Sequence, residues 1–277
     1  MEPTEPTFRI GDLAVRAFSD GILKTSLDLV LNMDRARATG LTGADSNGAL
    51  FIPVNNFLFQ RDGNTVLIDA GAGNTMQPTL GKLPENLRRG GIDPAAVTQI
   101  LLTHIHPDHA NGLVDDAGAP HYPNAEIVVH ETEMDFWLGD AQPGASENTK
   151  RMHQRARIDL KPYLSRIRRV KDGEDYLGCG VVLAAGHSPG HTVWRVSAGG
   201  EAFISWGDLV HLSAIQIAHP DTKLSYDLDA EKAVAARKRV LDMAASERLM
   251  VAGAHVNAPG FGHIIRKGLS YAFEPAA

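Results

Sequence analysis

Short apolar runs alternate with amphipathic stretches along the chain. Apolar runs bounded by turn residues are typical of buried strands, and we find them at 65–68, 100–103, 127–129, 181–185, 202–205 and 249–252. Helical periodicity is clearest in 229–247, where the apolar side chains share one face, and helices are also predicted at 84–89, 132–138 and 152–164. Residues 139–150 are expected to form a polar loop. Strands that alternate with helices predict an α/β fold.

Composition narrows the class of protein. With 277 residues, 43% of them hydrophobic, and a net charge of -6, the chain can bury a sizeable core and is not expected to be disordered. The length fits one large layered domain, and we expect a single domain over 1–277 because no linker divides the chain. The acidic balance argues against nucleic acid as a partner. No apolar run is long enough to cross a membrane, so a membrane is not an expected partner either. The candidate chemistry of the chain makes a small molecule the expected partner.

Two local features bear on the compartment. The only cysteine, Cys179, cannot form an internal disulfide and is interpreted as a turn residue between two glycines, with a reactive thiol left open. The first seven residues are acidic and Pro-rich, unlike the basic and apolar start of a signal peptide. We therefore expect a cytoplasmic protein.

The densest chemical signal follows the predicted strand 100–103. His104, His106, Asp108 and His109 occupy four of six consecutive positions. If strand geometry persists, His104 and His106 share a face, and Asp108 and His109 lie at the turn into a helix. Neutral imidazole and carboxylate are the ligands that catalytic zinc prefers. A polar loop that happens to contain histidines is the competing interpretation.

Three further candidates obey the same placement rule. His187, Asp208 and His255 each follow an apolar strand and one or more small residues. Each is therefore expected at the same edge of the sheets as His104. Seven nitrogen and oxygen ligands at repeated strand ends predict a metal centre.

Two other motifs compete with that interpretation. The stretch 186–190 satisfies Gly-x-Ser-x-Gly, the serine-nucleophile elbow, with Asp208 and His255 following in the order of a triad. However, Pro189 follows Ser188 and has no N–H for the oxyanion hole. Gly71 and Gly73 suggest a dinucleotide loop, but Met76 stands at the third glycine position, so a tight turn beneath the metal site is preferred.

The chain resembles the metallo-β-lactamase superfamily, whose His-x-His-x-Asp-His signature is matched by residues 104–109 and whose later elements are matched at 186–191, 207–208 and 254–255. This resemblance implies an αββα four-layer sandwich with a dinuclear site at one end of the sheets. It implies one metal held by His104, His106 and His187, a second held by Asp108, His109 and His255, and Asp208 as the bridge. Asp69 matches the position that orients a histidine ligand.

The metal set determines the expected chemistry. Two divalent ions, preferably Zn²⁺ with Mn²⁺, Co²⁺ or mixed occupancy left open, would lower the pKa of bound water toward about 7. Asp108 and Asp208 are the catalytic carboxylates, and the hydroxide between the ions attacks an ester-like bond. A non-catalytic metal-binding or scaffold protein is the alternative from another class, disfavoured because the ligand set is intact.

Within the superfamily, the C-terminal third looks most like the methyl parathion hydrolase branch. The segments that carry this similarity are 206–211, 214–216, 219–221 and 255–264. The expected substrates are lactones, aryl or carboxyl esters and organophosphate triesters, with an N-acyl homoserine lactonase as the alternative. The resemblance also suggests a homodimer, with residues 1–50 as a candidate interface.

Outer residues of the site are less clearly marked. The predicted pocket residues are Trp137, Met76, Met152 and Phe261. His263 is predicted to support the site from behind the ligands, and His211 is left open between that role and a surface position. No role in the site is assigned to His121, His130 and His219.

Overall fold

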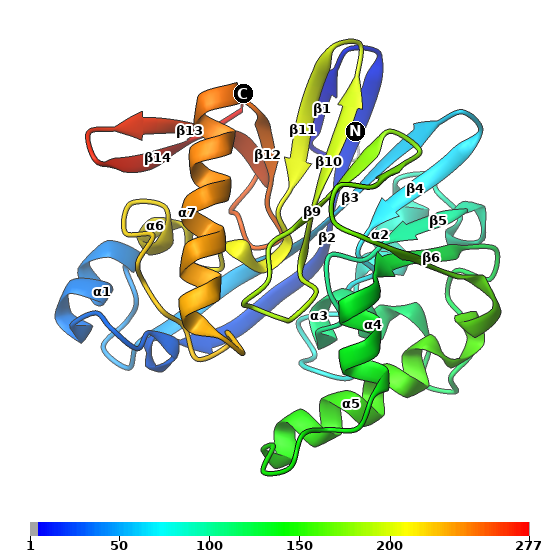
Figure 1. Cartoon of the computed structure of the whole chain (residues 1–277), viewed down its shortest axis with the longest axis horizontal. Coiled ribbons are helices and arrows are strands. Elements are labelled where there is room, and N and C mark those ends of the chain that lie inside the picture. The colour runs from blue at the N-terminus through cyan, green and yellow to red at the C-terminus, as the bar shows by residue number, and fades with distance from the viewer. Residues whose placement is uncertain (1–4, 277) are drawn as a thin grey trace.

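The computed structural model describes residues 5–276 and arranges them around two sheets (Figure 1). The first sheet has the order β1 (Thr7–Ile10), β2 (Leu13–Ser26), β3 (Ala49–Arg61), β4 (Asn64–Ile68), β5 (Gln99–Leu101), β6 (Glu126–His130) and β7 (Ile167–Val170). The second has the order β14 (Ser270–Pro275), β13 (Phe261–Lys267), β12 (Met250–Ala252), β11 (Glu201–Ser205), β10 (Thr192–Ala198), β9 (Cys179–Leu183) and β8 (Asp175–Tyr176).

The two sheets enclose an apolar core because their strands alternate between two buried faces. In β4, Val66 and Ile68 belong to the cluster between the sheets, whereas Leu67 belongs to the cluster beneath the helices. From the second sheet, Trp194 and Phe203 enter the same inner cluster. This period of two is what a strand buried on both faces requires.

Helices cover the outer faces and complete four layers. The helices are α1 (Arg35–Thr42), α2 (Leu83–Arg89), α3 (Pro107–Ala110), α4 (Glu131–Leu138), α5 (Glu147–Leu160), α6 (Ser213–Gln216) and α7 (Ala230–Glu247). Side chains of α2, α4 and α5 pack on the first sheet, and those of α7 pack on the second. Figure 1 shows α7 and α4 on opposite sides of the paired sheets. The predicted α/β sandwich is confirmed.

Most predicted elements are present, and several bounds differ. The six predicted strands fall in β4, β5, β6, β9, β11 and β12. The predicted loop 139–150 was wrong at its end, because Ser146 caps α5 by accepting a bond from the Thr149 N–H and the helix begins at Glu147. Cys179 is not a turn residue but the buried first residue of β9, where burial raises the pKa of its thiol to about 12.

The long strands β2 and β3 were not predicted. Their pairing is interrupted by a register shift between Ser19 and Gly21, where the buried carboxylate Asp20 breaks the apolar alternation. Asp20 accepts bonds from the N–H groups of Ala72, Gly81 and Leu83 at 2.9 to 3.0 Å. It thereby ties β2 to the loop after β4, and burial raises its pKa to about 6.

The direction of the strands brings the predicted metal ligands to one end of the molecule. In the first sheet β4, β5, β6 and β7 are mutually parallel. In the second, β9, β11 and β12 run in the same direction, because β10 is antiparallel to both β9 and β11 and β12 is parallel to β11. The carboxyl ends of these strands meet at the edges from which the loops carrying histidines and aspartates emerge.

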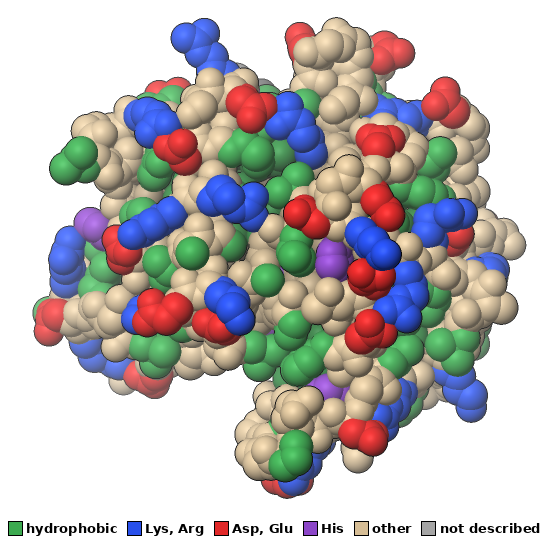
Figure 2. All heavy atoms as spheres, viewed as in Figure 1, with side chains coloured by type: hydrophobic (Ala, Val, Ile, Leu, Met, Phe, Trp, Pro, Cys, Tyr) green, Lys and Arg blue, Asp and Glu red, His purple; other side chains and the backbone are tan. Residues whose placement is uncertain are grey.

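The surface carries mixed charge. Figure 2 shows lysines and arginines interspersed with acidic side chains over the face in view. Within residues 5–276, no helix has both the length and the apolar character needed to cross a bilayer.

Candidate metal centre

The first ligand loop follows β5. The strand ends at Leu101, so strand geometry does not persist to His104 and His106 as predicted. His106 instead stands at the position before the short helix α3, which begins at Pro107 and carries Asp108 and His109 in its single turn. The loop brings the His104 and His106 ring centroids to 4.6 Å and the His104 and His109 centroids to 4.2 Å.

The other candidate ligands come from three loops of the second sheet. His187 follows β9, Asp208 lies in a 3-10 helix (Gly207–Leu209) after β11, and His255 follows β12. Gly207 has a φ of 50°, and a Cβ there would lie 2.8 Å from His191 Nε2 and from the Thr103 side chain. A glycine before Asp208 is therefore needed for the two halves to approach this closely.

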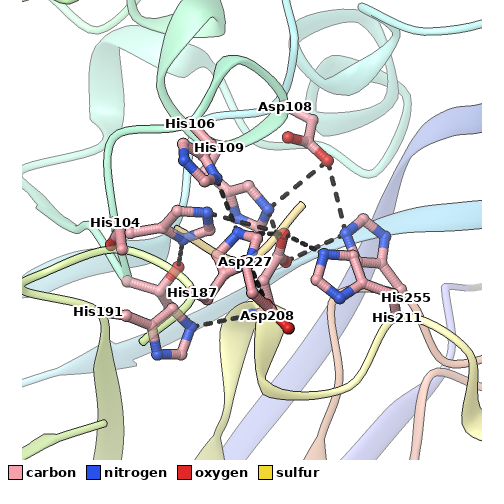
Figure 3. Close-up of polar contacts among 12 residues, drawn as sticks. His104, His106, Asp108, His109, His187, His191, Asp208, His211, Asp227 and His255 are labelled. Carbon is pink, nitrogen blue, oxygen red and sulfur yellow. Dashed lines mark hydrogen bonds and ion pairs between the residues drawn. The ribbon is translucent and has the colours of Figure 1, made fainter. Parts of the chain in front are cut away.

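The structure brings all seven predicted ligands together in two groups that share Asp208 (Figure 3). One group is His104, His106, His187 and Asp208; the other is Asp108, His109, Asp208 and His255. Within each group the ligand atoms lie within 4.8 Å of one another, and all members are buried. These are the groupings that the resemblance implied.

The carboxylate of Asp208 presents one oxygen to each group. Its Oδ2 lies 3.2 Å from His187 Nε2 and 3.7 Å from His104 Nε2. Its Oδ1 lies 2.8 Å from His109 Nε2 and 3.0 Å from His255 Nε2. A carboxylate placed in this way could bridge two cations, with one oxygen directed to each.

Polar atoms without partners show that the residues fit two cations. The Nε2 atoms of His104, His109 and His255 and Oδ1 of Asp208 are buried and, although they lie close to one another, their contacts do not form hydrogen bonds among the described residues. His106 Nδ1 and His187 Nε2 face each other at 2.7 Å. Buried polar groups are rarely left unpaired, and imidazole with carboxylate is a donor set suited to divalent transition metals.

Burial and neighbouring charge together set the pKa values of these groups. Burial, reinforced by the neighbouring histidines, holds the pKa of His104 and of His106 well below the ordinary value for histidine. Burial alone would raise the pKa of Asp208, but His109 and the other surrounding histidines hold it well below its usual range. For His104, His106 and Asp208 these are the protonation states that metal ligands need, whereas Asp208 and the neighbouring carboxylates outweigh burial and raise the pKa of His109, His187 and His255.

Carboxylates behind the ligands fix two of the rings. Asp69 Oδ2 lies 2.8 Å from His109 Nδ1, and Asp69 also accepts the Thr103 N–H at 2.7 Å. This places Asp69 where the sequence predicted it. Asp227, which sequence reasoning missed, lies with its Oδ1 3.1 Å from His187 Nδ1. Such contacts select the tautomer that leaves the other ring nitrogen free for a metal.

Glu133 of α4 joins the two halves and was also missed. Its Oε1 accepts the Ile105 N–H at 2.9 Å and the Trp137 Nε1–H at 2.7 Å. Its Oε2 accepts the Ser188 hydroxyl at 2.7 Å and the Gly190 N–H at 2.8 Å. The only sequence signal is an acidic residue beside Met134 and four residues before Trp137 on the buried face of a helix.

The same contacts remove the serine-nucleophile interpretation. Ser188 is fully buried, and its hydroxyl donates to the carboxylate of Glu133 rather than to a histidine. A serine nucleophile needs a base that can take its proton and an open approach for the substrate. Ser188 has neither.

Two further histidines complete the centre. His191 Nε2 accepts the Asp208 N–H at 3.0 Å, and burial lowers the pKa of His191 to about 3, which keeps the ring neutral. His211 lies with its Nε2 2.9 Å from Asp208 Oδ2 and stacks on His255 with a centroid distance of 5.1 Å. His211 is therefore part of the buried site rather than a surface residue.

A pocket of about 630 Å³ opens onto this centre. His106, Asp108, His187, Asp208 and His211 lie at its floor, and its walls come from the loop 75–77, from α5 and from residues 225–228. The predicted pocket residues Met76 and Met152 both line it.

Three predicted outer residues lie elsewhere. Trp137 is fully buried behind His106, with ring centroids 5.4 Å apart, and does not line the pocket. Phe261 packs on Phe8 between the sheets at 4.6 Å. His263 Nδ1 contacts the Leu249 carbonyl at 3.1 Å, at the end of β12 opposite to His255, so it does not support the ligands. In each case a core or backbone contact was mistaken for a site contact.

The glycine turn lies beside the site as predicted. Gly71 and Gly73 have φ values of 75° and 55°, and the Gly112 N–H donates to the Gly71 carbonyl at 2.9 Å. A Cβ at Gly71 would lie 2.4 Å from Asp20 Oδ1. The turn therefore serves close packing, not dinucleotide binding.

Comparison with known proteins agrees with this geometry. Residues 50–255 match the family model of the metallo-beta-lactamase superfamily, and the chain belongs to that superfamily. The αββα arrangement and the two ligand groups sharing one aspartate are consistent with that membership.

Two solved structures are similar over nearly the full length of the chain. The hydrolase AbOPH of the beta-lactamase superfamily superposes with a TM-score of 0.94 at 30% identity, covering 100% of this chain and 99% of its own. AidC, a dizinc quorum-quenching lactonase solved with a product, superposes with a TM-score of 0.92 at 25% identity, covering 99% and 98%.

A curated relative is similar over a shorter stretch. The N-acyl homoserine lactonase AiiB of Agrobacterium fabrum is 29% identical over 107 residues, covering 32% of this chain and 37% of the relative. The chain thus matches little more than a third of that relative's length.

Proposed function

We propose that this protein is a dinuclear metal-dependent hydrolase of ester-like bonds, with lactones as the leading substrate class. The observation that carries the proposal is the position of Asp208, which presents one oxygen to each of two buried histidine groups at the floor of an open pocket. Zn²⁺ is the preferred metal, because imidazole nitrogens supplemented by carboxylate oxygens are typical ligands of catalytic zinc.

When bound, two such ions supply a water of lowered pKa and Lewis acids for a developing oxyanion. The chain supplies the surroundings that this chemistry needs. Asp69 and Asp227 hold the rings of His109 and His187 in orientation. Asp108 lies at the pocket floor with its Oδ2 facing His109 and His255, so its Oδ1 would be the oxygen that accepts a proton or returns one to a leaving alcohol.

Lactones are favoured over the other ester-like substrates by the comparisons. AidC and AiiB are described as lactonases, and AidC is similar over almost its whole length. Organophosphate triesters, the substrates of the methyl parathion hydrolase branch, have less support from the pocket. Its walls present the flexible side chains Met76 and Met152 and the aromatic Tyr226, while the aromatic Trp137 lies outside it.

The test compares initial rates on three substrates: a γ-lactone, 4-nitrophenyl acetate and methyl parathion. Each is measured with the protein as isolated, after complete chelation, and after zinc is restored. We expect turnover that is lost on chelation and regained with zinc, with the lactone ranked first. Turnover that survives metal removal would contradict the mechanism, and a zinc-loaded protein inactive on ester-like bonds would favour a metal-binding scaffold.

We also propose that the protein is a homodimer joined through its N-terminal part, of which residues 5–50 are described. Large apolar side chains are exposed there and just beyond it: Ile22, Leu31, Leu41 and Phe51, the last with 62% of its surface accessible. Exposed apolar patches mark contacts between chains. Light scattering on Phe51→Asp, with the equally exposed Leu164→Asp as control, should show a monomer for the first variant alone.

A further inference from the structure

The pocket wall outside the metal ligands carries an unusual balance of charge. The chain as a whole is acidic, with 33 Asp and Glu against 27 Lys and Arg. Among the described residues that line the pocket, however, the only carboxylates are the two ligands Asp108 and Asp208. The remaining wall contains three cations, Lys24, Arg151 and Arg155.

These cations come from two separate elements that both reach the pocket. Lys24 lies on β2, where the Gln77 side chain fixes its backbone by accepting the Lys24 N–H and donating to the Lys24 carbonyl, both at 2.9 Å. Arg151 and Arg155 lie one turn apart on α5 and therefore share a face of that helix. These bonds hold the Lys24 backbone beside the loop 75–77, at the wall of the pocket.

Two of the three charges are not neutralised by the protein. Arg155 is paired with the buried carboxylate of Asp159, its Nε lying 3.0 Å from Oδ2. Lys24 and Arg151 have no carboxylate within ion-pair distance among residues 5–276. By contrast, Lys150 and Arg157 of the same helix, which do not line the pocket, are paired with Glu147 and Asp140.

We infer that the natural substrate carries an anionic group, such as a carboxylate, at a distance from the bond that is cleaved. The ester-like bond would lie over the metal ligands, and the anionic end would lie against Lys24 and Arg151. Met76, Met152 and Leu228 line the same pocket and suit an apolar segment between the two ends. This inference rests on the proposed function, because it concerns the substrate of that same centre.

The experiment uses two esters that differ at the far end by one methyl group, which removes the negative charge. They are 4-nitrophenyl hydrogen adipate, a monoanion, and methyl 4-nitrophenyl adipate, in which a methyl group removes the charge. Release of 4-nitrophenolate reports cleavage of the same bond in both, after the uncatalysed rate is subtracted. The zinc-loaded full chain is assayed as wild type, Lys24→Glu, Arg151→Glu and the control Lys150→Glu, which makes the same charge change outside the pocket.

We expect the kcat/KM of wild type to be about tenfold higher for the monoanion than for the methyl ester, chiefly through a lower KM. One pair of opposite charges near a protein surface contributes an interaction free energy large enough for a tenfold ratio. The preference should fall by about tenfold or more in Lys24→Glu and in Arg151→Glu, shrink with added salt, and persist in Lys150→Glu. Zinc content and circular dichroism show whether each variant is folded and loaded.

The outcomes separate the two proposals. Zinc-dependent cleavage of both esters without preference, or a preference unaffected by Lys24→Glu and Arg151→Glu, overturns the anionic substrate and leaves the hydrolase standing. If the zinc-loaded protein cleaves none of these substrates, neither the two adipates nor the lactone nor 4-nitrophenyl acetate, the hydrolase proposal itself is overturned.

Discussion

The two sheets contribute to the metal centre in different ways. The first sheet supplies His104, His106, Asp108 and His109 from one loop and the single turn of α3. The second supplies His187, Asp208 and His255 from three separate loops. In the first half, ligand spacing follows from local backbone geometry, whereas in the second it depends on strand register and on buried side chains that hold the loops together.

The difference extends to the groups that support the ligands. Asp69 serves the contiguous half by accepting the Thr103 N–H and orienting His109. In the scattered half, Asp227 orients His187, and His191 holds the backbone at Asp208. Glu133 then joins the loops of both halves. We expect variants of these residues to have different effects on metal binding according to the half they support.

The largest effect is expected for Asp208→Ala, which removes the ligand shared by both groups. Loss of a supporting contact behind a ligand costs about 10- to 100-fold in metal affinity or activity, and loss of the bridging ligand should exceed that. Zinc stoichiometry and rates on the lactone should both fall, with the second metal lost first. Full activity with two metals retained would show that Asp208 is not the bridge.

The next comparison sets Asp69→Ala against Asp227→Ala, one carboxylate from each half. Each should weaken zinc binding by about 10- to 100-fold, at the His109 position in the first variant and at the His187 position in the second. Both variants should also lose stability, because Asp69→Ala leaves the buried Thr103 N–H without its acceptor and Asp227→Ala removes the carboxylate that lies 3.8 Å from the buried Arg237 guanidinium.

Competition with a chromogenic chelator measures both zinc sites, and thermal unfolding measures stability. Asp140→Ala, a change at an exposed position, serves as control. Equal effects on both zinc sites in both variants would mean that the two halves are not supported independently.

A smaller effect is expected for Glu133→Gln. The amide places an NH₂ group against donors that the carboxylate accepts, so one or more buried donors lose their acceptor. The free energy of unfolding should fall by about 1–3 kcal/mol, and zinc affinity should fall in both groups. Urea unfolding measures the first quantity, with Glu131→Gln at the start of the same helix as control. A variant with wild-type stability and zinc affinity would remove Glu133 as the link between the halves.

The smallest effect is expected for Ser188→Ala, which removes one hydroxyl donor from Glu133. The cost in unfolding free energy should be about 1 kcal/mol, and most of the hydrolytic rate should remain. Rates and metal content are measured on the same sample. Complete loss of activity with unchanged metal content would reinstate Ser188 as a nucleophile.

The sequence revealed the ligands because their pattern is local or repeated. Residues 104–109 form a contiguous motif. His187, Asp208 and His255 each come after an apolar strand and directly after a glycine or alanine. Glu133 and Asp227 escaped notice, since an acidic residue in a helix or loop reads as solvated until burial is known. Trp137 and Phe261 were assigned wrongly because an aromatic in an apolar pattern looks the same whether it lines a pocket or fills the core.

By itself, the sequence determined the alternation of strands and helices, the α/β class and the donor types of the metal centre. These follow from short-range periodicity and from the chemistry of individual side chains. Only the tertiary structure decided that each oxygen of Asp208 faces a different histidine group, that Glu133 joins two loops, and that Lys24 and Arg151 line one pocket. Those features depend on the packing of segments far apart in the chain, which local pattern does not encode.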